Sequence, residues 1–331
     1  MELMPSFRFH RPTSLAEAVG ALTLDPHARL MAGGTDLLPN LRRFLARPGL
    51  LVDLTAVEGF GSIQKMADGG MRIGAGLTLD ALIENDYVAA DWPVLREAAL
   101  TVAGPTHRVA ATVGGNLCQD TRCMFFNQSE WWRASNGYCL KHDGDRCHVV
   151  VKSDRCFATY RGDLAPALMV LDAEAEVIGP EGVRRLKVAE LFCDSGANHL
   201  NLHAGEILVA VIVPAAEGWC AGYDKVRVRA AIDFPIAGVA AAICRRGSRL
   251  CALRVAITGC NSAPVQISTA EFDKTDWDTA TAEAVATAVR KSAEFRRTSN
   301  VSAKYRRHVL HAITVRLVER LWMQGSSLTV R

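Results

Sequence analysis

Four of the ten cysteines in this 331-residue chain fall in one irregular stretch. They are Cys123, Cys139, Cys147 and Cys156, and none of them makes the close C-x₂₋₄-C pair that is typical of structural zinc sites. Thiolates are soft ligands that suit Zn²⁺ or an iron–sulfur cluster. The spacing leaves zinc open and suits a [4Fe–4S] cluster at least as well.

Other residues near this stretch compete for a place in such a site. Cys118 forms C-x₄-C with Cys123, but it adjoins a glycine loop, so we expect it not to be a ligand. His142 and His148 offer alternative ligands, although four thiolates suffice without them. The remaining cysteines lie in apolar or strand-like contexts and are expected to be core residues: Cys193, Cys220, Cys244, Cys251 and Cys260.

Two glycine loops carry a second chemical signal. Paired glycines permit positive φ and close ligand approach, and exposed N–H groups in such turns form an anion nest. Taken alone, each Gly-Gly pair is more often only a turn, and neither loop matches G-x-G-x-x-G or the P-loop. The first loop is Ala32, Gly33, Gly34, Thr35 and Asp36, and the second is Thr112, Val113, Gly114, Gly115 and Asn116.

Local patterns predict the elements that position these loops. Ser14 and Glu17 fit a capping box at a helix start, and the first glycine loop precedes another likely helix. The apolar pattern predicts strands at 50–57, 71–79, 166–179 and 206–214, and a helix at 94–104.

A second unit is expected after residues 215–222, where the texture of the sequence changes. Residues 223–234 and 250–260 alternate, and 235–245 has the pattern of a buried strand. Two helical patterns follow at 277–295 and 303–322. The domains are therefore predicted as 1–217 and 218–331.

Composition excludes several classes of protein. The chain is 49% hydrophobic and 22% charged, with a net charge of +3, which gives no support for nucleic-acid binding. The N-terminus lacks a signal-peptide pattern, and the longest apolar stretch, 236–244, is too short to span a bilayer. We expect a cytoplasmic protein without membrane contact, in which clustered cysteines indicate metal or redox chemistry.

The segments "AGGTDLLPNLRR" and "TVGGNL" resemble the paired motifs of the FAD-binding subunits of the molybdenum hydroxylases. The segments "FRFHRPTSLAEAV", "DLAPALMVLDAEAEV", "KVRVRAAIDFPIAGVAAAI" and "RVAITGCNSAPVQ" extend the resemblance over most of the chain. It implies an α+β fold, with a two-part FAD-binding domain followed by a smaller α/β C-terminal domain of antiparallel sheet plus helices. It also implies FAD contacts at Ala32, Gly33, Gly34, Thr35, Asp36, Thr112, Gly114, Gly115, Asn116 and Asp163.

The chain departs from that family in an insert at about 119–161, which replaces a short polar turn near the flavin. The insert, with "NLCQDTRC" and "DGDRCHVV", resembles that of one branch, the β subunits of 4-hydroxybenzoyl-CoA reductases. This resemblance implies a [4Fe–4S] cluster held by Cys123, Cys139, Cys147 and Cys156.

The resemblance also implies a function. Electrons would pass from ferredoxin through the cluster and FAD to [2Fe–2S] clusters in a small subunit. They would end at a molybdenum cofactor in a large subunit, within a dimer of heterotrimers. The chain itself would carry no catalytic residue. Lys225, Arg229 and Asp233 are expected near the flavin end of the C-terminal domain.

Two rival hypotheses remain open from the sequence. One is an ordinary FAD subunit that passes electrons to NAD, with zinc or nothing in its insert. The other is a non-enzymatic protein of this fold whose zinc-stapled loop is a docking surface. Acid-labile sulfide distinguishes them from the reductase, because zinc sites lack it.

Overall fold

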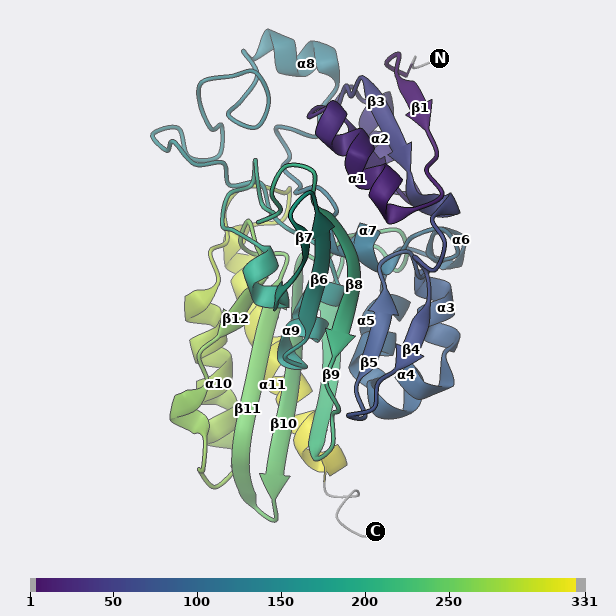
Figure 1. The fold of residues 1–331 in the computed structure, drawn as a ribbon. Helices are drawn as coiled ribbons and strands as arrows, with labels where there is room; N and C mark the ends of the chain where they lie inside the picture. Colours follow the sequence, from purple (N-terminus) through teal and green to yellow (C-terminus); the bar gives the residue numbers. More distant parts are fainter. Residues whose placement is uncertain (1–3, 326–331) are drawn as a thin grey trace.

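The structure, a computed structural model, describes residues 4–325, which form three sheets with helices around them (Figure 1). The first sheet lies near the N-terminus and has the parallel order β1-β3-β2. Its elements are β1 (Arg8–His10), α1 (Leu15–Leu24), β2 (Arg29–Met31), α2 (Leu37–Arg42), β3 (Leu50–Asp53) and the 3₁₀ turn η1 (Leu54–Ala56).

The second sheet is antiparallel, with the order β4-β5-β8-β6-β7. Its strands are β4 (Ile63–Lys65), β5 (Met71–Gly74), β6 (Glu174–Gly179), β7 (Gly182–Lys187) and β8 (Ile207–Val213), with η2 (Val188–Leu191) after β7. The long connection from β5 to β6 holds α3 (Leu79–Glu84), α4 (Asp86–Asp91), α5 (Pro93–Leu100), α6 (Pro105–Arg108), α7 (Val113–Leu117), α8 (Glu130–Ser135) and α9 (Leu164–Val170).

The third sheet is antiparallel and has the order β12-β11-β10-β9. In β10, one of its two central strands, successive side chains pack alternately into two different hydrophobic cores. Val239, Ala241 and Ile243 pack with the two C-terminal helices, whereas Ala240 and Ala242 join the core of the preceding domain. The elements are β9 (Trp219–Val226), β10 (Ala237–Arg246), β11 (Arg249–Thr258), β12 (Val265–Ile267), η3 (Ala270–Phe272), α10 (Thr279–Ser292) and α11 (Ala303–Gly325).

These elements confirm the predicted fold class and most of the predicted segments. Ser14 accepts a hydrogen bond from the N–H of Glu17 (3.2 Å), as a helix N-cap does. The predicted strands at 50–57, 206–214, 235–245 and 250–260 correspond to β3, β8, β10 and β11, and the predicted helices at 94–104, 277–295 and 303–322 to α5, α10 and α11.

Three predicted strands are wrong in part. Residues 166–179 form helix α9 and then strand β6, because an apolar run that is buried all round has no period that separates helix from strand. The strand expected at 71–79 ends at Gly74, and Thr78 caps α3 instead. Within 223–234, only the first residues belong to a strand, since β9 ends at Val226.

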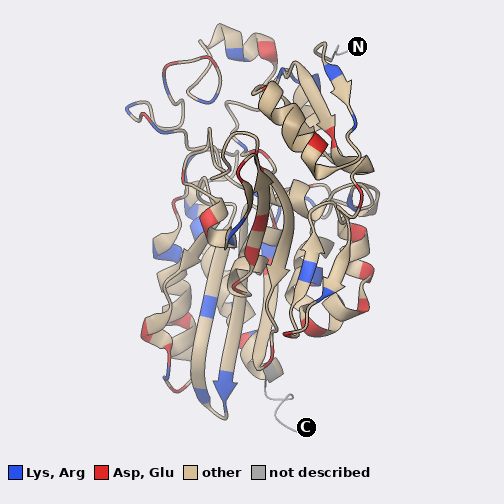
Figure 2. Cartoon of the chain, viewed as in Figure 1, with Lys and Arg blue, Asp and Glu red and all other residues tan. Residues whose placement is uncertain are grey.

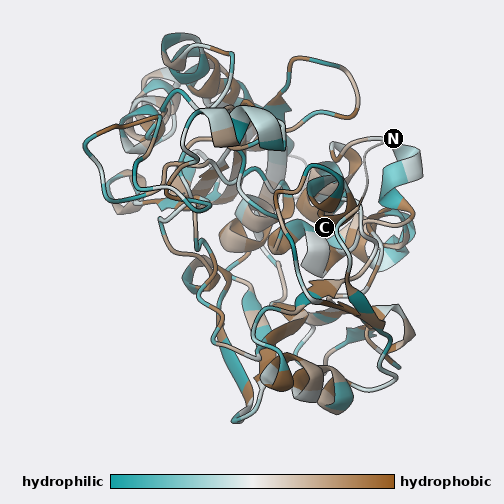
Figure 3. Ribbon diagram, turned by 90° about the horizontal axis from the view of Figure 1, so that it is seen from above, coloured by the Kyte–Doolittle hydropathy of each residue, from teal (hydrophilic) through white to brown (hydrophobic). Residues whose placement is uncertain are grey.

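The insert lies beside the first sheet and α1, at the top of Figure 1, and α8 is its only helix among the described residues. Seen from above, hydrophilic and hydrophobic residues are interspersed along the helices, strands and loops of the chain (Figure 3). Trp131 is exposed, whereas Phe126 is buried. Phe126 packs with Cys123, Cys156 and Ala158 in a small core that the insert shares with Leu45, which follows α2.

Acidic and basic residues both occur on the helices, strands and loops of the chain (Figure 2). None of the helices within residues 4–325 combines the length and the apolar character needed to cross a membrane.

Candidate functional site

The first glycine loop connects β2 to α2. Gly34 has a φ of +69°, a left-handed conformation that favours glycine. A Cβ on Gly33 would lie 1.7 Å from the carbonyl oxygen of Ala110, so this loop touches the chain just before the second loop. Within the described residues, the backbone N–H groups of 33–36 donate no backbone hydrogen bond. Free donors in a tight turn suit an anion such as a pyrophosphate.

The second glycine loop forms the short helix α7. Thr112 caps this helix, and its hydroxyl accepts a hydrogen bond from the N–H of Gly115 (3.0 Å). The N–H of Gly114 donates to the carbonyl of Ala75 (2.8 Å), and a Cβ on Gly114 would lie 2.8 Å from the Cβ of Ala75. The N–H groups of Gly114 and Gly115 already donate within the protein, so a ligand beside this loop would contact other atoms of the loop.

The four cysteines expected to be ligands line one cavity in the insert. Cys123, Cys147 and Cys156 are buried and Cys139 is half-buried. Phe125, Phe126, Leu140, Lys141, His148, Val149 and Ala158 line the same cavity. Cys118 is not among the lining residues and packs against the main core instead. The structure thus brings together four thiols that are distant in sequence.

The two histidines near the cysteines have other contacts. His148 lines the cavity, but its Nε2 lies 2.5 Å from the carbonyl oxygen of Tyr138. His142 lines an adjacent cavity and pairs with Asp143 (2.9 Å). Within residues 4–325, no three His, Cys, Asp or Glu side chains are grouped so as to hold one metal ion.

Burial favours the protonated form of two of the cavity thiols. It raises the pKa of Cys123, and it raises that of Cys156 to about 11. The charge of Lys141 acts in the opposite direction on Cys156. Because cysteines bind metals as thiolates, a metal centre in this cavity would displace these protons.

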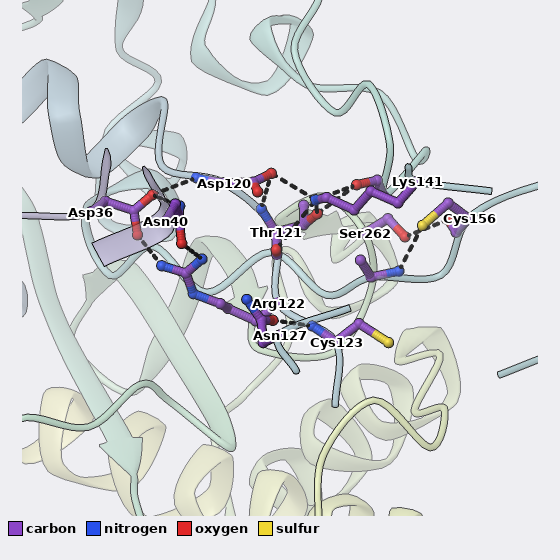
Figure 4. Close-up of polar contacts among 12 residues, drawn as sticks. Asp36, Asn40, Asp120, Thr121, Arg122, Cys123, Asn127, Lys141, Cys156 and Ser262 are labelled. Atoms are coloured by element: carbon purple, nitrogen blue, oxygen red, sulfur yellow. Dashed lines mark hydrogen bonds and ion pairs between the residues drawn. The ribbon is translucent and has the colours of Figure 1, made fainter. Parts of the chain in front are cut away.

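A polar network joins the first glycine loop to this cavity, as Figure 4 shows. The carboxylate of Asp36 forms an ion pair with Arg122, and it accepts a hydrogen bond from the N–H of Asp120 (3.1 Å). Arg122 also donates to Asn40 (3.2 Å). Because Arg122 directly precedes Cys123, the network fixes the insert against the loop that begins α2. Burial is the largest influence on Asp36 and raises its pKa.

Arg161 is a buried cation that lacks a partner. Its Nε is buried without a hydrogen-bond partner among the described residues, and the side chain forms no ion pair there. Burial, reinforced by the charges of Arg306 and Arg122, lowers its pKa to about 10, so it stays charged at neutral pH, and Asp233 and Cys123 favour that charge. A buried guanidinium without a direct ion-pair partner is costly. This position therefore fits an anionic group.

Asp163, expected to contact the flavin, uses its carboxylate within the protein. It accepts hydrogen bonds from Tyr223 (2.6 Å) and from the ammonium of Lys225 (3.0 Å to each oxygen). Arg229 and Asp233 lie in a more exposed loop, where Asp233 accepts from the N–H of Arg229 (2.9 Å). Of these expected contacts, Asp163 and Lys225 are therefore brought together, and Arg229 and Asp233 pair separately.

Sequence reasoning missed several charged residues at the centre of this region. Arg122, Lys141 and Arg161 are among seven basic residues of the insert, and the sequence does not reveal which of them are buried. The only signal was position, since Arg122 adjoins a cysteine and Arg161 lies two residues before Asp163.

Two family models match nearly the whole chain. Residues 5–216 match the FAD binding domain in molybdopterin dehydrogenase, and residues 222–321 match the CO dehydrogenase flavoprotein C-terminal domain.

Individual proteins are also similar to this chain. The aldehyde oxidoreductase FAD-binding subunit PaoB of Escherichia coli (strain K12) is 36% identical, over 81% of this chain and 86% of that protein. The carbon monoxide dehydrogenase medium chain of Afipia carboxidovorans is 31% identical, over 78% of this chain and 76% of its own length. The solved CO dehydrogenase from Oligotropha carboxidovorans superposes with a TM-score of 0.78 at 26% identity, covering 96% of this chain and 99% of that one.

Proposed function

Since this chain belongs to the FAD-binding subunit family of the molybdenum hydroxylases, we propose that it carries electrons between FAD and a [4Fe–4S] cluster. The chain is the FAD-binding subunit of an oxidoreductase of the xanthine and CO dehydrogenase type. The observation that carries the further step is the cavity lined by Cys123, Cys139, Cys147 and Cys156.

The flavin is proposed to lie along the two glycine loops. Free N–H groups at 33–36 support a pyrophosphate contact at the first loop. The glycine at 114 lets the second loop pack closely on Ala75, with the N–H of Gly114 2.8 Å from its carbonyl oxygen, and this contact fixes the position of the loop beside the proposed flavin. The ten residues named from the family motifs are the proposed contacts to FAD. Asp163 would act mainly through Lys225 and Tyr223.

The four cysteines are proposed to hold a [4Fe–4S] cluster, because the donor set and the cavity fit one. Four sulfur ligands around one zinc ion lie about 3.8 Å apart, given Zn–S bonds of about 2.3 Å. No such single-ion group occurs within residues 4–325, although all four thiols share a cavity. In a [4Fe–4S] centre Cys123, Cys139, Cys147 and Cys156 would each supply a thiolate ligand. Arg161 offers positive charge beside Cys123.

When bound, FAD and the cluster would supply two-electron and one-electron exchange. The residues of this chain supply the placement. Arg122 pairs with Asp36 of the first glycine loop and adjoins Cys123 in sequence, so one short segment connects both proposed sites. Phe125 and Phe126 line the cavity and exclude water from it.

The finer assignment is to a 4-hydroxybenzoyl-CoA reductase. In this proposal ferredoxin is the donor, and the partners are a molybdenum-cofactor large subunit and a [2Fe–2S] small subunit in a cytoplasmic dimer of heterotrimers. Its support is the four-cysteine insert in "NLCQDTRC" and "DGDRCHVV". Residues 1–217 and 218–331 are the proposed domains.

In a second candidate function, electrons pass in the outward direction, from an aldehyde to an acceptor such as NAD. The 36% identity to an aldehyde oxidoreductase FAD-binding subunit favours it. A non-enzymatic docking role, with zinc in the insert, has less support, because the similar proteins over most of the chain are subunits of oxidoreductases.

The deciding experiment measures iron, acid-labile sulfide and zinc per FAD in the anaerobically purified enzyme with its partner subunits. We expect about four iron and four sulfide per flavin. Zinc, or no metal at full flavin loading, would contradict the cluster. Reduction of the flavin by ferredoxin with 4-hydroxybenzoyl-CoA turnover supports the reductase, and flavin reduction by an aldehyde supports the second candidate.

A further inference from the structure

Lys141 is a buried cation in the wall of the four-cysteine cavity. Its side chain is 5% exposed, and it lines the cavity together with Cys123, Cys139, Cys147 and Cys156. Its ammonium donates to Asp120 (2.6 Å), to the carbonyl of Gly196 (2.9 Å) and to the hydroxyl of Thr121 (Figure 4). These bonds hold the charge in one place.

The charge of Lys141 is only partly balanced at the cavity. Its partner Asp120 is 32% exposed, so water screens the carboxylate better than it screens the ammonium. The ammonium also lies 4.9 Å from the ring centre of Phe126, another cavity residue. The electrostatic effect reaches one of the cavity sulfurs, because Lys141 favours the thiolate of Cys156. The cavity therefore experiences a net positive field from this pair.

We propose that Lys141 sets the reduction potential of the centre held by the four cysteines. This inference rests on the proposed function. Reduction adds one electron from a one-electron donor, breaks no bond, and makes the centre one charge more negative. A fixed cation in a low-dielectric wall stabilises that form more than the oxidised one. Lys141 thereby raises the potential, and Asp120 lowers it.

The test uses the anaerobically purified enzyme with its partner subunits, and a redox titration followed by the electron paramagnetic resonance of the reduced centre. Lys141→Met should shift the equilibrium about tenfold toward the oxidised form, which corresponds to a potential lower by about 59 mV. Asp120→Asn, which leaves the ammonium without its counter-charge, should shift the potential upward. Lys141→Arg keeps the charge and should stay close to wild type.

A lysine elsewhere provides the matched control. Lys187 on β7 pairs with Asp172 and Glu174 at the surface and is 44% exposed, so Lys187→Met should leave the potential unchanged. Iron and sulfide are measured in every variant. If Lys141→Met does not retain the centre, Asp120→Asn decides, because it keeps the lysine.

An Asp120→Asn or Lys141→Met enzyme with full iron and the wild-type potential would overturn the inference while leaving the proposed function intact. A wild-type enzyme without iron and sulfide would instead overturn the function on which the inference rests. The two failures are therefore distinguished by the wild-type metal content alone.

Discussion

Buried charged residues concentrate where the insert meets the glycine loops. Lys141 and Arg122 have acidic partners there, whereas Arg161 has none among the described residues. A protein retains such costly groups where a ligand or a fixed local geometry needs them. His199 belongs to the same region and is buried with its Nε2 unpaired.

His199 should make the protein acid-sensitive. Burial, reinforced by Lys141, lowers its pKa to about 4, whereas an unfolded chain binds the proton near 6.5. Between these values only the unfolded state is protonated, so stability present above pH 6.5 is lost as the pH falls toward 4. The expected loss is about 3 kcal/mol.

Denaturant unfolding at pH 7 and pH 4.5 measures this loss. His199→Phe removes the titrating group and should lose less stability across the same interval than wild type does, whatever its stability at pH 7. Equal losses in both proteins would show that other groups cause the acid sensitivity.

At the scale of elements, short segments were predictable where their period or capping residues differ from their surroundings. The helix N-cap at Ser14 and the strands β8 and β10 are examples. Helix α9 was not predictable, because all of its seven residues are buried and its apolar run carries no helical period. The glycine loops were found from their composition, but the contact between them depends on tertiary structure.

Gly33→Ala should separate the two glycine loops. The new methyl group would lie 1.7 Å from the carbonyl oxygen of Ala110, which is backbone and cannot turn aside as a side chain can. We expect a loss of bound FAD greater than tenfold and a lower melting temperature. Flavin absorbance per protein after gel filtration measures the first effect.

Gly20→Ala is the control for that substitution. Gly20 lies in α1, and a Cβ there would meet nothing within 4 Å. Alanine is the better helix former by about 0.5–1 kcal/mol, so this variant should bind FAD normally and melt slightly higher. Normal FAD binding by Gly33→Ala as well would show that the loops are not held at this contact.

At the scale of the whole molecule, the two domains share a core and a buried ion pair. The third sheet is buried on both faces, by α10 and α11 on one side and by the core around α9 on the other. The fold class and the cysteine set followed from sequence motifs. The pairing of Asp163 with Lys225 did not, because it joins residues 62 positions apart whose charges are common at surfaces.

Removing only one member of the Asp163–Lys225 pair should destabilise the protein more than removing both members. Asp163 and Lys225 are 4% and 2% exposed, so Asp163→Ala leaves an ammonium buried without a counter-charge. The expected loss is about 3–5 kcal/mol. Asp163→Ala combined with Lys225→Met removes both charges and should recover most of that stability, as measured by denaturant unfolding.

The same double variant separates a structural role of Asp163 from a flavin contact. If Asp163 acts by fixing Lys225 and Tyr223, FAD content should recover together with stability, because the domains dock again without a buried charge. If the carboxylate binds FAD directly, the flavin stays lost in a protein of restored stability, since alanine at position 163 supplies no acceptor. Measuring FAD content at matched stability decides between these roles, because the domain contact then no longer differs between the proteins compared.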